Sequence, residues 1–150
     1  MAATESWDLE EVGGDTAGLA ALLRAGGLPV DDLGDPGRVF FRLRAADGAV
    51  AGYVGLELHG REALLRSLVV DPRSRGKGHG TRLVEQAARR AAGLGIRDLY
   101  LLTTTAEDFF AARGFARIDR SAVPQSIAAS REFASLCPAS ATVMRRPALA

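Results

Sequence analysis

Residues 65–83 read LRSLVVDPRSRGKGHGTRL, an apolar strand-like run followed by a glycine-rich loop and the start of a helix. The alternating glycines around Lys77 and His79 let the backbone adopt positive φ and approach a ligand closely. Backbone N–H groups and the helix dipole at such a site attract anions. The stretch therefore predicts a loop that holds a phosphate or pyrophosphate, with Arg73, Arg75 and Lys77 adding positive charge.

Two common phosphate-binding loops do not fit this spacing. A Walker loop needs Ser or Thr directly after its lysine, whereas Gly78 follows Lys77. A dinucleotide fingerprint needs GxGxxG inside a βαβ unit, whereas the spacing here is GxGxG after an antiparallel strand. Taken alone, GxGxG is equally compatible with a glycine-rich turn that carries solvated charges. Its position between a strand and an amphipathic helix favours the anion site.

The pattern of apolar residues and turn signals predicts the elements around this loop. Strands are expected over residues 7–12, 38–44, 49–58, 63–70, 98–104, 115–118 and 141–144. Helices are expected over residues 16–25, 80–94, 105–114 and 124–136. The predicted caps are Asp15 for the first helix and a capping box of Thr105 and Asp108 for the third. This order predicts an α/β (α+β) sandwich with one mixed sheet.

Length and composition limit the class of protein. A chain of 150 residues fits one domain, 1–150, and its net charge of +1 gives no field that attracts nucleic acid or an anionic membrane. A lone cysteine, Cys137, excludes an internal disulfide, and with only His59 and His79 besides we expect no metal centre. No secretion signal and no apolar run of about 18 residues is visible, so we expect a cytoplasmic protein.

The stretch 65–83 resembles motif A of the GNAT superfamily of acetyl-CoA-dependent N-acetyltransferases, whose core is (R/Q)xxGxG/A. Arg75, Gly78 and Gly80 supply that core here. The resemblance extends over most of the chain and implies the GNAT fold, a mostly antiparallel sheet of six to seven strands flanked by helices. Residues 99–110 (LYLLTTTAEDFF) and 123–144 (VPQSIAASREFASLCPASATVM) are similar to the GNAT group encoded with arsenic-resistance genes.

The resemblance implies a cosubstrate, acetyl-CoA, and no metal. It implies that the CoA pyrophosphate is held by Arg75, Gly76, Lys77, Gly78, His79, Gly80 and Thr81. It also implies that the pantetheine pairs with Leu68, Val69 and Val70 as an added strand would, and that a backbone N–H there polarises the thioester carbonyl. The implied reaction is direct attack by a neutral amine on acetyl-CoA. The implied substrate is a small amine, such as an amino acid or an arsenic-containing amino acid.

The hairpin of strands 49–58 and 63–70 offers a candidate substrate surface. If its turn has two or four residues, strand alternation puts charged and apolar residues on one face: Tyr53, Glu57, Glu62, Leu64 and Arg66. The opposite face is then almost entirely apolar and belongs to the core: Val54, Leu56, Leu58, Leu65 and Val69.

On the mixed face we propose Glu57 as a general base acting through water, and Arg66 as a clamp for a substrate carboxylate or other oxyanion. The alternative, equally compatible with the sequence, is that Glu57 and Arg66 form a salt bridge on the sheet. Near the C-terminus, Arg131 and Glu132 are adjacent and cannot share a helix face, so we expect one of them to point to substrate and the other to solvent. Cys137 is more readily a small buried hydrophobic residue than an arsenic ligand.

Residues 109–115, FFAARGF, depart from a GNAT pattern that reads FYxxxGF. The resemblance puts Phe110 in the cofactor site, where many members carry a tyrosine that protonates the departing CoA thiolate. Phe110 has no proton to give. Either the CoA thiolate leaves without an acid, or water or the hydroxyl of Thr103, Thr104 or Thr105 serves instead, or the chain is not a catalyst. Acetylation of a peptide amine and a non-catalytic acyl-CoA sensor remain alternatives. The resemblance is compatible with a homodimer.

Overall fold

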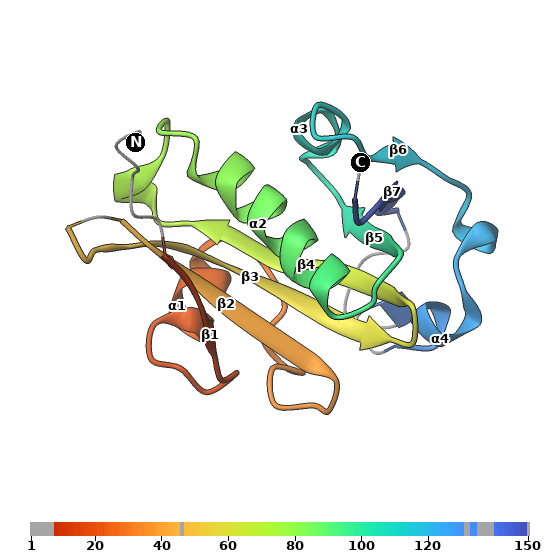
Figure 1. Cartoon of the computed structure of the whole chain (residues 1–150), viewed down its shortest axis with the longest axis horizontal. Coiled ribbons are helices and arrows are strands. Elements are labelled where there is room, and N and C mark those ends of the chain that lie inside the picture. The colour runs from red at the N-terminus through yellow and green to blue at the C-terminus, as the bar shows by residue number, and fades with distance from the viewer. Residues whose placement is uncertain (1–7, 46, 131–132, 135–139, 150) are drawn as a thin grey trace.

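The computed structural model describes residues 8–45, 47–130, 133–134 and 140–149 (Figure 1). Within these residues seven strands form one sheet in the order β1-β2-β3-β4-β5-β7-β6. The strands are β1 (Asp8–Val12), β2 (Arg38–Arg44), β3 (Val50–His59), β4 (Glu62–Val70), β5 (Asp98–Thr103), β6 (Ala116–Arg117) and β7 (Thr142–Pro147). Every neighbouring pair is antiparallel except β4 and β5. This confirms the predicted fold class, a mixed and mostly antiparallel sheet flanked by helices.

The helices cover both faces of the sheet (Figure 1). They are α1 (Leu19–Ala25), α2 (His79–Gly93), α3 (Glu107–Ala111) and α4 (Gln125–Ala128). On one face, α2 buries its predicted apolar stripe against the sheet: Leu83, Val84, Ala87, Ala88 and Ala91. On the other face, Leu19 and Leu23 of α1 pack with Phe40, Tyr53 and Val69. The α2 stripe recurs at helical spacing, which is why the sequence identified it.

Three predicted helix boundaries are wrong. The first helix begins at Leu19, where Gly18 with φ 91° is the N-cap, so Asp15 does not cap it. The third begins at Glu107 without a side-chain cap; Thr103 Oγ1 instead accepts a hydrogen bond from Ala106 N at 3.0 Å. The fourth is an α-helix only over Gln125–Ala128, and much of the remaining predicted span lies outside the described residues. Such ends depend on local backbone geometry that residue patterns indicate poorly.

A β-bulge in β4 overturns part of the predicted strand alternation. Glu57 pairs with Leu64 and Gly55 with Arg66, as predicted, but Tyr53 pairs with Val69. Two residues, Ser67 and Leu68, therefore stand opposite Val54, and the side chains beyond them change faces. Val69 consequently packs beside Tyr53 and α1, not on the face where the alternation predicted it.

Next to the bulge, β3 and β4 approach each other so closely that only glycine fits at position 52. A Cβ on Gly52 would lie 2.3 Å from the carbonyl oxygen of Val69. Gly52→Ala should therefore lower the free energy of unfolding by about 2 kcal/mol or more, measured by urea denaturation, because the backbone must move. Gly93→Ala is the control: its Cβ would meet nothing within 4 Å and its residue is helical, so stability should stay equal or rise. Equal stability of the two variants would contradict this account of the bulge.

Candidate functional site

A cleft opens where β4 and β5 separate. The two strands pair only through Glu62 with Asp98, Ala63 with Leu99 and Leu64 with Tyr100. Both strands then continue, β4 to Val70 and β5 to Thr103, without pairing to each other. A cleft of about 480 Å³ lies between them, lined by residues 65–70, residues 101–106, the turn after α1, and the aromatic rings of α3.

The cleft edge of β4 is suited to bind an extended ligand. Within the described chain, no strand pairs with β4 on this side beyond Leu64. A strand edge of this kind presents backbone N–H and C=O groups to any partner that can add as a further strand. The predicted pantetheine-binding residues Leu68, Val69 and Val70 all line the cleft here. The edge can thus pair with a ligand that carries amide groups along its length.

The glycine-rich loop lies at one end of this cleft. Gly76 and Gly78 have φ of 80° and 79°, and a Cβ on either would meet no neighbouring atom within 4 Å. Their positive φ confirms the backbone freedom expected of the loop, and Gly78 is the N-cap of α2. Gly80 has another role: a Cβ there would lie 3.1 Å from the ring of Phe109, which lines the cleft. This contact joins the start of α2 to the cleft wall.

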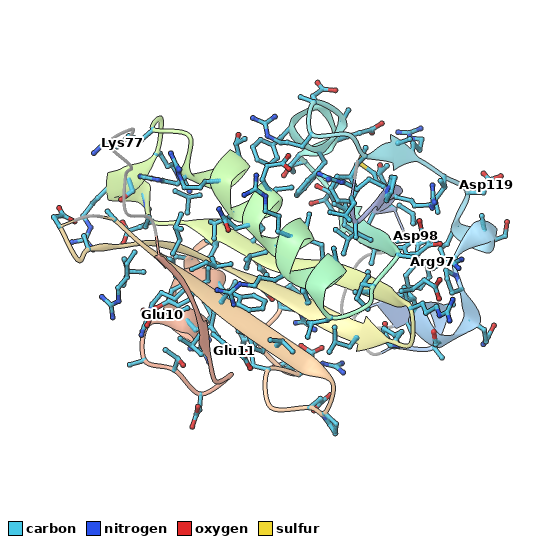
Figure 2. All side chains as sticks on the ribbon, viewed as in Figure 1. Glu10, Glu11, Lys77, Arg97, Asp98 and Asp119 are labelled. Atoms are coloured by element: carbon cyan, nitrogen blue, oxygen red, sulfur yellow. The ribbon has the colours of Figure 1, made fainter. Side chains whose placement is uncertain are left out.

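Charged side chains around the loop differ in their direction. Arg75 lines the cleft, whereas Lys77 is exposed and projects from the loop ahead of α2 (Figure 2). His79 is buried, and its pKa is lowered by that burial and then by the positive charges of Lys77 and Arg82. The imidazole is therefore neutral near pH 7, and positive charge at the loop comes from the arginines and the lysine.

A contact that the sequence did not reveal ties α2 to the segment FFAARGF. Arg113 donates from Nε to the Thr81 hydroxyl at 2.9 Å and from Nη1 to the Phe109 carbonyl at 2.9 Å. Its guanidinium also lies 4.0 Å from the centre of the Phe109 ring. Arg113 therefore fixes the first turn of α2 against α3, next to the glycine-rich loop.

Phe110 lies at the cleft. Its ring lines the cleft and packs edge-on against Phe109 and Phe115, at centroid distances of 5.1 and 5.7 Å. Thr103 at the end of β5, and Thr104 and Thr105, which lie between β5 and α3, also line the cleft. Thr103 Oγ1 accepts from Ala106 N, which leaves its own proton available to donate.

Glu57 and Arg66 belong to a buried cluster of charges. Arg66 Nη2 donates to Asp32 Oδ1 at 2.6 Å, Nη1 donates to Asp32 Oδ2, and Nη1 lies 3.4 Å from Glu57 Oε1. Arg38 adds contacts of 3.1 Å to Asp32 and 3.4 Å to Glu57, and His59 Nε2 lies 2.6 Å from Glu57 Oε2. Two carboxylates and two guanidinium groups thus neutralise each other.

This cluster bears on the two alternatives for Glu57 and Arg66, a catalytic pair or a salt bridge. The Glu57 side chain is only 1% exposed and is not among the residues that line the cleft. Arg66 does line the cleft, but its guanidinium is engaged by Asp32. The geometry favours the salt-bridge alternative, with Asp32 as the principal partner. Sequence reasoning missed Asp32 because it lies in the irregular segment between α1 and β2, where no periodicity indicates direction.

Burial and ion pairing act against each other on Asp32. Burial raises the pKa of its carboxyl, while hydrogen bonds and charge from Arg66, and then from Arg38, lower it, and the pKa ends below its usual value. Asp32 is therefore ionised near neutral pH. The contribution of this pairing to stability is present above the ordinary aspartate pKa and is lost as the pH falls through the lowered one.

Arg131, Glu132 and Cys137 lie outside the described part of the chain, as does Trp7, the first residue of the predicted strand 7–12. Among the described residues, no group of three or more His, Cys, Asp or Glu side chains could hold a metal ion. No described helix is long and apolar enough to cross a membrane.

Comparison with known proteins finds relatives that share parts of this chain. An amino-acid acetyltransferase of Ralstonia nicotianae is 32% identical over 81 residues, which cover 53% of this chain and 18% of the relative. The amino-acid acetyltransferase of Pseudomonas aeruginosa is 43% identical over 51 residues, 34% of this chain and 12% of that protein. The chain thus spans less than a fifth of the length of these curated relatives.

Solved structures share the fold along almost the whole chain. An N-acetylglutamate synthase of Neisseria gonorrhoeae, complexed with coenzyme A and N-acetyl-glutamate, superimposes with a TM-score of 0.73 at 22% identity, covering 93% of this chain and 35% of that one. The IAA acetyltransferase of Bacillus cereus gives a TM-score of 0.67 at 17% identity, covering 95% and 99%. The sequence profile described as the acetyltransferase (GNAT) family matches residues 7–118, so this chain belongs to the GNAT acetyltransferases, enzymes that use acetyl-CoA as cosubstrate.

Proposed function

We propose that this chain transfers the acetyl group of acetyl-CoA to the amine of a small molecule, most directly an amino acid. The observation that carries the proposal is the unpaired edge of β4, which runs along the cleft beside the glycine-rich start of α2. The pantetheine amides suit the strand edge and the pyrophosphate suits the loop. Amino-acid acetyltransferases among the relatives support the acceptor class.

In the proposed reaction, the amine nitrogen attacks the thioester carbonyl and the carbon–sulfur bond breaks. A backbone N–H at the bulge, where Ser67 and Leu68 line the cleft, stabilises the negative charge that develops on the carbonyl oxygen. The nitrogen loses one proton and the CoA thiolate takes one. The acetylated amine and CoA are the products.

The attacking amine enters as its free base in this proposal. Among the described residues that line the cleft there is no carboxylate and no histidine that could accept its proton. The carboxylate of Glu57 is held in the buried cluster by His59, Arg38 and Arg66. Solvent therefore takes the proton, and the pKa of the acceptor amine governs the pH dependence.

Finer features of the proposal rest on sequence resemblance. The similarity of the C-terminal third to the arsenic-resistance-associated group supports an arsenic-containing amino acid as one proposed acceptor. A homodimer is proposed from the same resemblance, whereas a single domain over 1–150 and a cytoplasmic location are proposed from length and composition. The alternatives are acetylation of a peptide amine and acyl-CoA sensing without catalysis.

The test is a thiol-release assay with acetyl-CoA and a panel of amines. The panel contains proteinogenic amino acids, glutamate-like amino acids, an arsenic-containing amino acid and a short peptide with a free N-terminus. Turnover of free amino acids above the peptide supports the proposal, and preference for the peptide favours the alternative acceptor. Binding of CoA without turnover of any amine would leave only the sensor.

Replacement of a loop glycine should weaken CoA binding. Gly78→Ala puts a methyl group into the proposed anion cradle, and CoA affinity should fall about tenfold by calorimetric titration. Gly60→Ala is matched to it, because Gly60 also has positive φ (64°) and no atom within 4 Å of its Cβ position, but it lies in the β3–β4 turn. Both variants should lose similar stability, about 1 kcal/mol. Equal CoA affinity of the two variants would exclude the loop as the anion site.

Glu57→Gln should separate the structural role from the catalytic one. The variant breaks a buried charge cluster, so we expect a lower melting temperature. The pH profile of kcat/KM should keep its shape and rise with pH until the amine is deprotonated. If Glu57 is the general base instead, the variant will lose most of its activity and the profile will change its slope below the amine pKa.

Phe110→Tyr restores the hydroxyl that many GNAT members carry. The ring lines the cleft, so the hydroxyl can be accommodated there, and CoA binding should stay within about twofold. Turnover should also be retained, because a thiolate with a thiol pKa near ~8.5 leaves tolerably without an acid. Measured kcat values decide this point: a large gain would show that proton donation limits the natural enzyme.

A further inference from the structure

We propose that Asp32, Arg66 and Ser67 form a brace that holds the β4 bulge in the geometry that acetyl transfer needs. This inference rests on the proposed function, since it concerns how the bulge presents its backbone to the thioester. Asp32, Arg66 and Ser67 are positioning residues in this view. Together they fix the backbone that contacts the substrate.

The bulge stores steric strain at Ser67. Ser67, with φ of 57°, is the only residue other than glycine that has positive φ among the described residues. A bulge of this kind usually places glycine at the left-handed position, because a Cβ there crowds the backbone. A serine at such a position therefore calls for a compensating interaction that glycine could not make.

The serine hydroxyl supplies that interaction. Arg66 Nε donates to Ser67 Oγ at 3.1 Å, and both side chains are buried. The hydrogen bond joins neighbouring residues of the same strand, which a regular strand would point to opposite faces. It therefore depends on the bulge and in turn favours it.

Asp32 holds the other end of the guanidinium. Its two oxygens accept from the two terminal nitrogens of Arg66, a bidentate pair in which both side chains are fully buried. Such a pair fixes the plane of the guanidinium, and with it the direction of the Nε–H toward Ser67. The chain of contacts thus runs from Asp32 through Arg66 to the bulge.

The brace also connects two walls of the cleft. Ser67 and Leu68 line the cleft on the β4 side, and Gly26, Gly27 and Leu28 line it on the α1 side. Asp32 follows these glycines closely in the chain, between α1 and β2. Fixing Asp32 on Arg66 therefore sets the bulge relative to the segment that follows α1 and lines the cleft.

Kinetics of three variants test the brace. Ser67→Gly removes the hydroxyl and leaves a residue that adopts positive φ freely, so it should fold at least as stably as the natural protein. Its kcat should fall about tenfold while the Kd for acetyl-CoA stays within about twofold. Asp32→Asn should lose kcat in the same way, with a lower melting temperature.

Arg38→Gln is the matched control for Asp32→Asn. Arg38 contacts Asp32 at 3.1 Å and Glu57 at 3.4 Å in the same cluster, but it is not part of the path to Ser67. It should lower the melting temperature and keep kcat within about twofold. Natural kcat in Ser67→Gly, or an equal loss of kcat in Arg38→Gln and Asp32→Asn, would overturn the brace.

Infrared spectroscopy of bound acetyl-CoA tests how the bulge polarises the thioester carbonyl, and it needs no acceptor amine. Acetyl-CoA labelled with ¹³C at the thioester carbonyl should show its carbonyl stretch at lower frequency on the natural protein than in water. Ser67→Gly and Asp32→Asn should return the band toward the free value, and Arg38→Gln should not. Bound acetyl-CoA with the same band in all four proteins would overturn the brace alone. Failure of the natural protein to bind acetyl-CoA would overturn the proposed function with it.

Discussion

The separation of β4 from β5 is the constraint on which the rest of the site depends. Parallel pairing holds the strands together only as far as Leu64 and Tyr100, and each strand then follows its own direction. The backbone of residues 65–70 is left with an open edge, and the space beside it becomes the cleft. A continuous ladder would satisfy the same backbone groups internally and leave no place for an extended ligand.

The bulge and the buried charges hold the backbone of this open edge in one geometry. Pairing with β3 sets the register of β4, and the bulge within that pairing decides which face each residue beyond Arg66 points to. In this chain Ser67 fixes the bulge, and Arg66 and Asp32 join the bulge to the segment between α1 and β2. The cost of burying four charges is offset by their mutual pairing, and the geometry obtained is specific. The shape of the cleft therefore depends on the buried contacts among Asp32, Arg66 and Ser67 as well as on the residues that line it.

Prediction from sequence was accurate where the apolar residues of an element follow a single helical or strand periodicity. Helix α2, the antiparallel strands and the positive φ of Gly76 and Gly78 follow from apolar spacing and from glycine placement, and the structure confirms them. Prediction failed for Val69, because a bulge breaks the strand period. It also failed at the caps of α1 and α3, where Gly18 and Ala106 take positions assigned to polar side chains. Local geometry of this kind leaves little trace in residue order.

The sequence by itself determined the family, the positive φ of the loop glycines Gly76 and Gly78 and the absence of a tyrosine at position 110, since each of these is carried by residues close together in the chain. Only the tertiary structure decided what Glu57 and Arg66 do. Their partner Asp32 lies 34 positions from Arg66 in the chain, in a segment without periodicity. The residue pattern of a charged pair on a strand face is the same whether the pair contacts a substrate or a carboxylate from elsewhere in the fold. The difference is made by burial, which long-range packing alone provides.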